Sequence, residues 1–195
     1  MAVYMSAEQT HWLWALALGL VGYGVADLAS GIVHWASDTY GSANTPYLGP
    51  LFIKPFRDHH DCPEAIAKNS LYDRFGASCL FAVKLILGCL LAAHSVADSW
   101  AVAALLSFAL GLSSGLVFAV QAHVWSHQER VPTVVTVLRR AGLVVGAEEH
   151  DLHHRGAFES RYCIATGWWN RPLDHWRVFN RLDKLIQRCR LGRSA

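Results

Sequence analysis

The sequence has few charged residues, and residues 1–10 contain no Lys or Arg. Only 16% of the 195 residues are charged whereas 53% are apolar, which is more apolar than a water-soluble domain of this length usually is. The net charge of +2 is small, so nothing in the composition suggests a nucleic-acid partner. A secretory signal would begin with a positive region, which makes that interpretation of the first segment weak.

Cysteine is also sparse, and its pattern excludes two kinds of site. The five cysteines form no Cys-x-x-Cys pair, and Cys79 and Cys89 fall inside an apolar run. An odd, scattered set argues against a disulfide framework and against a thiolate metal site. The sequence therefore predicts reduced thiols in a reducing compartment.

Long apolar runs are abundant, at residues 12–33, 77–97 and 100–122. Each is long enough, at roughly 1.5 Å per residue, to cross a hydrocarbon layer of roughly 30 Å. Gly111 and Gly115 give a Gly-x-x-x-Gly spacing, which predicts close packing between helices.

A fourth apolar stretch, at residues 131–146, is interrupted by Arg139 and Arg140 and is typical of an interfacial or re-entrant segment. The predicted fold is an all-α polytopic membrane protein with about three transmembrane helices, or four if this segment spans. We expect one domain over residues 1–195, with helices at about 12–34, 77–97 and 100–127, an interfacial segment at 131–146, a histidine helix at 148–155 and an amphipathic tail at 172–191.

Histidine is the residue that stands out. Eight of the eleven histidines lie in four short clusters, which are His34, then His59 and His60, then His123 and His127, then His150, His153 and His154. Residues at i, i+3 and i+4 share one face of a helix, and neutral imidazole is a common ligand of iron, zinc, copper and nickel. A structural zinc site closes with four ligands, so eight imidazoles point to two metal ions.

The distribution of positive charge indicates the topology. Lys and Arg lie between the first two apolar runs, after the third run and in the tail, whereas residues 1–10 and the turn at 95–99 have none. The positive-inside rule then places the charged side, with all eight histidines, on the cytoplasmic face. The tail combines an apolar face (Trp176, Phe179, Leu182 and Ile186) with basic residues, which predicts a helix on the membrane surface or a docking face for an acidic partner.

Asp27 is the only ionisable residue inside the first apolar run. A carboxylate inside a membrane is costly and is by default a functional candidate. A helix-packing hydrogen bond with Ser30 or a neighbouring segment is an equally weighted interpretation of this residue.

Several longer motifs resemble one known family. They are residues 27–39 (DLASGIVHWASDT), 52–60 (FIKPFRDHH), 121–127 (QAHVWSH), 150–154 (HDLHH) and 162–170 (YCIATGWWN). Together they resemble the Kua family of lipid desaturases, over about residues 26–186. That family includes plasmanylethanolamine desaturase, which forms the vinyl-ether bond of plasmalogens, and a plastid desaturase that introduces a trans-3 bond into phosphatidylglycerol. Glu149 departs from the pattern, because the plasmalogen branch has a further histidine there.

The resemblance implies two non-haem iron ions held by the eight histidines, dioxygen as co-substrate and electrons from a cytochrome b5- or ferredoxin-type carrier on the cytoplasmic face. The substrate would be a membrane glycerolipid, most closely an alkyl-ether phospholipid, in a bacterial inner membrane or an endoplasmic-reticulum-type membrane. Carboxylates and amides near the ligands can fix histidine tautomers. The candidates for that role, or for weak metal ligation, are Asp27, Asp38, Glu149, Asn170 and Asp174. The head-group candidates are Arg57, Lys68, Arg139, Arg140 and Arg155.

Three alternatives to vinyl-ether formation stay open. The same metal centre could desaturate an acyl chain at the trans-3 position, or hydroxylate a lipid instead of desaturating it. A non-catalytic metal-binding membrane protein, acting as a sensor or transporter, is the alternative outside enzymes.

Overall fold

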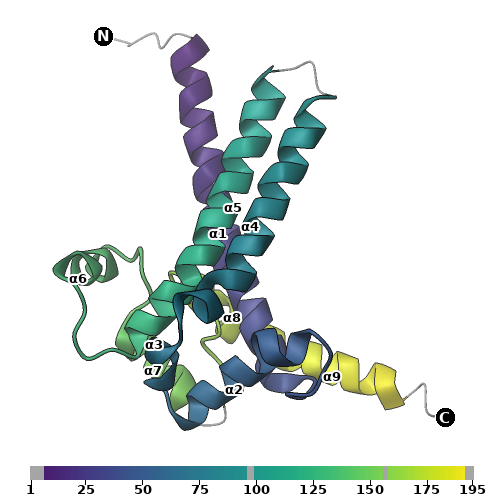
Figure 1. Cartoon of the computed structure of the whole chain (residues 1–195), viewed down its shortest axis with the longest axis vertical. Coiled ribbons are helices and arrows are strands. Elements are labelled where there is room, and N and C mark those ends of the chain that lie inside the picture. Colours follow the sequence, from purple (N-terminus) through teal and green to yellow (C-terminus); the bar gives the residue numbers. More distant parts are fainter. Residues whose placement is uncertain (1–6, 96–98, 156–157, 192–195) are drawn as a thin grey trace.

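The computed structural model describes residues 7–95, 99–155 and 158–191, and these residues form helices and loops without any strand. Three of the helices are long and apolar enough to cross a membrane (Figure 1): α1 (Ala7–Thr39), α4 (Leu71–Ala93) and α5 (Ser99–Ser126). The predicted all-α fold with three transmembrane helices is therefore confirmed. The turn expected at residues 95–99 falls largely on residues 96–98, which lie outside the described part of the chain.

The shorter helices gather at one end of the three long ones (Figure 1). The start of α1 lies at the opposite end, where His11 stacks on Trp100 at the start of α5 with ring centroids 4.9 Å apart. The elements of the gathered end are η1 (Gly49–Ile53), α2 (Lys54–Asp61), α3 (Ala65–Lys68), α6 (Thr133–Arg140), α7 (Ala147–His154), α8 (Asn170–His175) and α9 (Val178–Leu191).

Small residues let α1 and α5 approach closely. A Cβ atom added at Gly111 would lie 1.9 Å from the backbone oxygen of Gly19, and one added at Gly115 would lie 2.5 Å from the Cβ of Ala26. Since real atoms never come so close, these backbones can touch only where the side chains are absent. The close packing predicted from the Gly-x-x-x-Gly spacing is confirmed.

The helix bounds differ from the predicted ones in ways that affect the site. The first helix continues to Thr39, so His34 lies more than a turn inside it and Asp38 is also helical. The 131–146 stretch contains only the eight-residue helix α6, which is too short to cross a bilayer, so the four-span alternative is not adopted. Its buried Val135 packs in a core that includes Ala122 of α5.

The tail is broken where one continuous helix was predicted. Arg177 has a positive φ of 49°, which ends α8 before α9 begins. Phe179 of α9 stacks on Trp35 of α1 with ring centroids 5.0 Å apart, and Ile186 joins the same core. Trp176, predicted on that apolar face, is 59% exposed because it falls at the break. The structure does not describe the side chain of Arg190.

Candidate metal centre

Four helices that are distant in sequence bring the histidine clusters together. His34 comes from α1, the His59–His60 pair from α2, His123 from α5 with His127 directly after it, and the last three histidines from α7. Five of these side chains are buried: His34, His59, His123, His150 and His153. The convergence predicted from topology is present, and it divides the residues into two groups.

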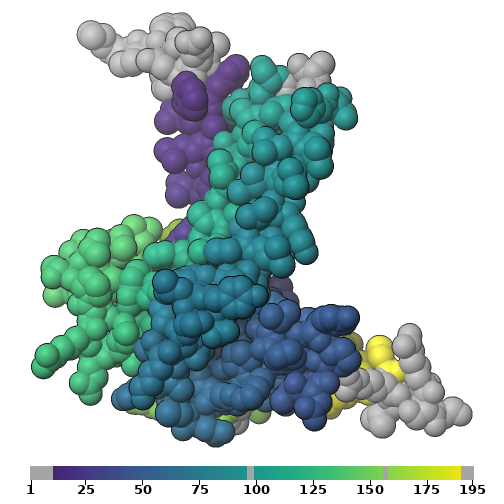
Figure 2. Space-filling view, viewed as in Figure 1, coloured from purple at the N-terminus to yellow at the C-terminus, as the bar shows by residue number. Residues whose placement is uncertain are grey.

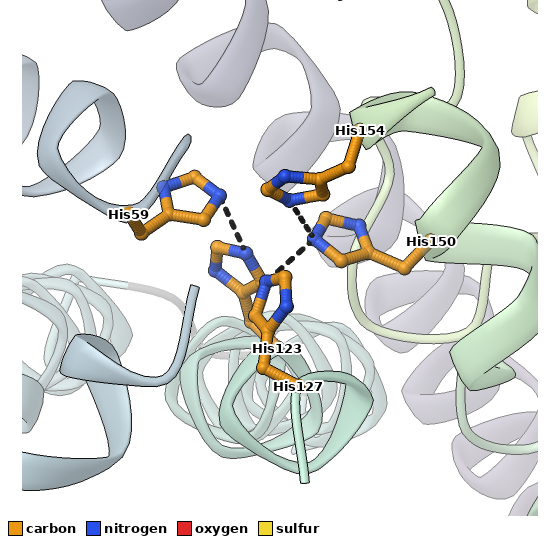
Figure 3. A group of neighbouring side chains, drawn as sticks. All are labelled: His59, His123, His127, His150 and His154. Atoms are coloured by element: carbon orange, nitrogen blue, oxygen red, sulfur yellow. Dashed lines mark hydrogen bonds between the residues drawn. The ribbon is translucent and has the colours of Figure 1, made fainter. Parts of the chain in front are cut away.

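The first group contains five histidines, which are His59, His123, His127, His150 and His154. Figure 3 shows their rings pointing toward one another from α2, α5 and α7. The Nε2 atoms of His59 and His123 are 3.2 Å apart, and Nε2 of His150 lies 3.0 Å from that of His127 and 3.2 Å from that of His154. Two imidazole nitrogens bound cis to one metal at about 2.1 Å lie about 3.0 Å apart, so these spacings match those of ligands around a common ion.

The second group contains three histidines and one carboxylate, which are His34, Asp38, His60 and His153. Oδ2 of Asp38 lies 3.3 Å from Nε2 of His34, 3.6 Å from Nε2 of His60 and 3.5 Å from Nε2 of His153. Asp38 was predicted to orient a histidine or to be a weak metal ligand. Its oxygen stands among the three nitrogens at nearly equal distances, as a fourth ligand atom would.

Hydrogen bonds to backbone carbonyls place a lone pair on Nε2 of His34 and of His153, and Nε2 of His153 also lies 3.2 Å from Nε2 of His60. Nδ1 of His34 donates to the backbone oxygen of Tyr162 at 3.0 Å, and Nδ1 of His153 donates to that of Ser160 at 2.7 Å. In the neutral ring, the proton is then on Nδ1 and Nε2 carries a lone pair. Nε2 of His34 and both carboxylate oxygens of Asp38 are buried without a hydrogen-bond partner. Because converging acceptors repel one another in a buried site, this donor set fits a metal ion.

Burial keeps several of these histidines neutral. Together with the positive charge that neighbouring histidines would carry, it lowers the pKa of His59 to about 2 and that of His60 to about 3. The same causes lower the pKa of His127 and of His154 to about 4. The pKa of His150 lies well below its usual value, again mainly because of burial. Neutral imidazole is the form that binds metals, so these rings are available as ligands at pH 7.

The two groups lie side by side within an aromatic enclosure. His59 of the first group and His60 of the second are consecutive residues, and their ring centroids are 4.5 Å apart. Phe158 stacks on His60 at 4.1 Å, and Phe56 lies 4.6 Å from His34 and 5.9 Å from His123. These rings limit the access of water to the ligands, which favours metal binding by neutral nitrogen and strengthens electrostatic interactions.

The comparisons with known proteins agree with a site of this composition. A family model described as the lipid desaturase domain matches residues 23–194, which is most of the chain. The chain belongs to the lipid desaturase family. The resemblance seen in the motifs is thereby confirmed, and no solved structure matches the chain.

Relatives of this desaturase domain include plasmanylethanolamine desaturases and a chloroplastic fatty acid desaturase. The chain is 35% identical to plasmanylethanolamine desaturase of Myxococcus xanthus over 90% of its own length and 61% of the relative. It is 36% identical to plasmanylethanolamine desaturase 1 of Mus musculus over 87% of its own length and 64% of the relative. It is 32% identical to chloroplastic fatty acid desaturase 4 of Arabidopsis thaliana, over 86% of its length and 50% of the relative. The chain thus spans less than two thirds of the length of these relatives.

Asp27 of the desaturase domain anchors a loop and belongs to neither ligand group. Its Oδ1 accepts from the backbone N–H groups of Ala165, Thr166 and Gly167 at 2.8–3.1 Å. Gly167 has a φ of +76°, a conformation that glycine adopts without strain. Ser30 donates to the backbone oxygen of Asp27 and not to its carboxylate. Of the two interpretations of Asp27, the structure supports the hydrogen bond to a neighbouring segment.

The other predicted polar candidates also lie outside the two groups. Glu149 and Asp174 both pair with Arg161, through oxygen–nitrogen distances of 2.5 and 3.0 Å. Asn170 bridges the backbone of Cys163, since its Oδ1 accepts from the N–H at 2.8 Å and its Nδ2 donates to the carbonyl at 3.0 Å. These residues fix the 161–170 segment, and that segment supplies the Tyr162 carbonyl to His34.

The head-group candidates divide into engaged and exposed side chains. Arg57 donates to the backbone oxygens of Ser37 and Tyr40 at the end of α1, both at 3.1 Å. Arg139 donates to the backbone oxygen of Trp125 at 2.8 Å, near the end of α5. Such contacts satisfy carbonyls that a helix end leaves free. The other three candidates are exposed: Lys68, Arg140 and Arg155, the last paired with Asp151.

Some residues of the site carry no signal that a single sequence offers. The carbonyls of Ser160 and Tyr162 orient ligands through the backbone, so no side-chain type identifies them. Phe56 and Phe158 contact the histidine rings, but isolated phenylalanines near a membrane surface are common. Asp38 follows His34 at i, i+4, which indicates a contact with that histidine, and only the fold shows that two further histidines reach the same oxygen.

Proposed function

We propose that this domain is an oxygen-dependent lipid desaturase whose two ligand groups each hold one non-haem iron ion. The observation that carries the proposal is the pair of adjacent groups, five histidines in one and three histidines with Asp38 in the other. Imidazole and carboxylate ligands without thiolate suit iron, and two-metal sites are an established means of sharing charge during a reaction. Membership of the lipid desaturase family supports the same chemistry.

The reaction has a simple balance. A saturated –CH2–CH2– unit, dioxygen, two electrons and two protons give a –CH=CH– unit and two molecules of water. The metal pair, when bound, would supply the reduction of dioxygen. The residues of the chain hold the metals with neutral imidazoles, orient the rings through the Ser160 and Tyr162 carbonyls, and keep water away with Phe56 and Phe158.

The most favoured substrate is an alkyl-ether phospholipid, which would give the vinyl-ether bond of a plasmalogen. Two relatives named plasmanylethanolamine desaturase, at 35% and 36% identity, support this choice. The relative named fatty acid desaturase 4, at 32% identity, supports an acyl chain as the second candidate.

The electrons would come from a small acidic carrier of the cytochrome b5 or ferredoxin class, docking on the face that carries the histidines. The exposed basic residues Arg177, Arg181, Lys184 and Arg188, on α9 or just before it, support such a surface. Beneath them, Phe179 lies 5.1 Å from Tyr162, whose ring is 5.1 Å from His153. This row of aromatic contacts leads from α9 to the second ligand group. The excess of Lys and Arg at this end of the molecule supports a cytoplasmic orientation.

The test is expression of the full chain in a host that is supplied with alkyl-ether lipid. Lipids are analysed by mass spectrometry before and after mild acid, in the wild type, in His153→Ala and in His94→Ala. His94 is an exposed histidine that directly follows α4, at the end far from the metal centre, so it controls for the loss of an imidazole. We expect an acid-labile product lighter by two hydrogens with the wild type and with His94→Ala, and none with His153→Ala.

Other outcomes are equally informative. A new double bond in an acyl chain would support the desaturase activity and show that the substrate is an acyl chain instead of an alkyl-ether chain. An added hydroxyl group would indicate hydroxylation. Unchanged lipids in the presence of reduced carrier, together with bound redox-inactive metal, would contradict the enzyme proposal and favour a metal-binding sensor.

A further inference from the structure

A groove of about 690 Å³ lies between η1–α2 on one side and α3–α4 on the other. Leu51, Lys54 and Asp58 line the first side, and Tyr72, Gly76 and Leu80 are among the residues on the second. Figure 2 shows the blue segments that precede α4 spread beneath the lower ends of the long teal helices.

The groove reaches the metal centre. His59, whose Nε2 faces His123 in the five-histidine group, also lines this groove. A second hollow of about 490 Å³ between α4 and α5 is lined by residues such as Phe75, Ile86 and Leu110 and by no histidine. A molecule in the first groove would therefore lie against the ligands, and one in the second would not.

Charge is confined to one end of the groove. Lys54, Asp58 and Asp73 lie at the end beside His59, near the start of α4. From there the lining continues along α4 to Leu80 and Val83, which are 57% and 62% exposed on a membrane-spanning helix. The ten residue steps from Asp73 to Val83 rise by about 15 Å, so the groove follows α4 into the apolar layer.

We propose that this groove binds the apolar chain of one membrane glycerolipid. The glycerol end of the lipid lies beside His59 and the charged residues, and the rest of the chain runs past Gly76 and Leu80 toward the bilayer. A lipid fits this groove because its polar end meets the exposed Lys54–Asp58 ion pair and Asp73, while its chain meets apolar side chains on a helix long and apolar enough to cross a membrane. The assignment deepens the proposed function and rests on it.

The position of His59 has a consequence for the reaction. The groove passes the histidine group at its charged end, so the carbons near the glycerol lie closest to the metal centre. A chain held this way is oxidised near its head-group end and not at its middle. The α3–α4 side of the groove is held together by Arg74 of α4, which donates to the backbone oxygen of Ala67 at 2.8 Å and to that of Asn69 at 3.3 Å.

Gly76 provides the sharpest substitution. A Cβ atom at this position would meet only the Tyr72 ring, at 3.8 Å, which is an ordinary contact, so a short side chain fits and a larger one extends into the groove. Gly88 is the matched control, because it is an exposed glycine of the same helix whose added Cβ would meet nothing within 4 Å. Gly76→Leu should lower product formation by about tenfold or more through displacement of the chain, while Gly88→Leu leaves it unchanged.

A binding measurement separates this inference from the activity. Membranes containing the full chain are mixed with a glycerophospholipid whose alkyl chain carries a diazirine, illuminated and digested, and the labelled peptides are mapped. We expect label within residues 72–83 in the wild type, in His153→Ala and in Gly88→Leu, and at least a fivefold loss there in Gly76→Leu. Metal content, measured in parallel, should be equal in Gly76→Leu and Gly88→Leu.

Absence of label from both walls of the groove, residues 50–59 and 65–83, in the wild type would overturn the groove assignment, whatever the activity. Product formation by Gly76→Leu at the wild-type rate would overturn it as well. Labelling within the groove without any lipid product would instead contradict the proposed reaction and leave the binding site standing.

Discussion

At the scale of single residues, Asp38 is the most informative side chain of the metal centre. It is nearly buried, its two oxygens have no hydrogen-bond donor, and three imidazoles approach the same oxygen. A buried carboxylate in that position needs a positive charge, which a metal ion supplies. The i, i+4 spacing from His34 reveals the contact with one histidine. The contacts with His60 and His153 depend on how α2 and α7 pack against α1, which no local pattern encodes.

Replacing Asp38 should therefore remove one metal ion and not both. Asp38→Asn retains the shape of the side chain but loses its charge, so the second group keeps three neutral ligands and the five-histidine group stays complete. Iron measured by elemental analysis should fall from about two ions per chain to about one, with loss of lipid product. Glu129→Gln, which removes an exposed carboxylate in the loop after α5, is the control and should retain both ions. An unchanged iron content in Asp38→Asn would exclude the carboxylate as a ligand.

At the scale of helices and loops, the sequence predicts what depends on local pattern. Three apolar runs give the three long helices, and the glycine spacing gives the α1–α5 contact, because length and side-chain size decide both. The break at Arg177 and the course of the 161–170 segment could not be predicted. The course of the 161–170 segment depends on tertiary hydrogen bonds, above all those that three consecutive backbone N–H groups give to Asp27. The break comes with a positive φ at Arg177, which this residue type does not signal.

The anchoring role of Asp27 makes a prediction that differs from the one for Asp38. Asp27→Ala leaves the N–H groups of Ala165, Thr166 and Gly167 buried without their acceptor, which should lower the free energy of unfolding by about 3 kcal/mol or more. The measurement is thermal unfolding in detergent, with iron content determined well below the midpoint. Ser114→Ala loses only one intrahelical bond, to Gly111, and should cost about 0.5 kcal/mol or less.

The iron content of Asp27→Ala distinguishes the two interpretations of this carboxylate. We expect it to match that of the wild type at low temperature, since Asp27 belongs to neither ligand group. Loss of iron from a variant that unfolds at the wild-type temperature would instead favour a role at the metal centre.

At the scale of the whole molecule, topology predicts that the histidine clusters meet, and packing decides how they divide. Alternating spans place the ends of α1 and α5 on one side, so convergence follows from counting helices. The division into a five-histidine group and a group with Asp38 depends on the ring orientations of neighbouring residues. His59 faces one group and His60 the other, as do His154 and His153, because adjacent side chains on a helix point in different directions.

The basic surface of α9 and the groove proposed for lipid lie against different ligand groups. Phe179 of α9 contacts Tyr162, whose ring lies 5.1 Å from His153 of the second group, whereas His59 of the first group lines the groove. If a small acidic carrier delivers electrons at α9, the double variant Arg181→Glu, Lys184→Glu should raise the KM for the reduced carrier by about tenfold. Both side chains are exposed, so the fold and the turnover rate at saturating carrier should be retained.

The measurement is lipid product formed against the concentration of reduced cytochrome b5 or ferredoxin, at low and at high salt. The difference in KM between the wild type and the double variant should shrink as the salt concentration rises, because salt screens the attraction between exposed charges. Arg130→Glu reverses an exposed basic residue between α5 and α6 and should leave the KM unchanged. Equal KM values for the double variant and the wild type at low salt would contradict carrier docking on α9. That result would assign its basic residues to anionic lipid head groups, which weaker binding of the double variant to vesicles rich in phosphatidylglycerol would then show.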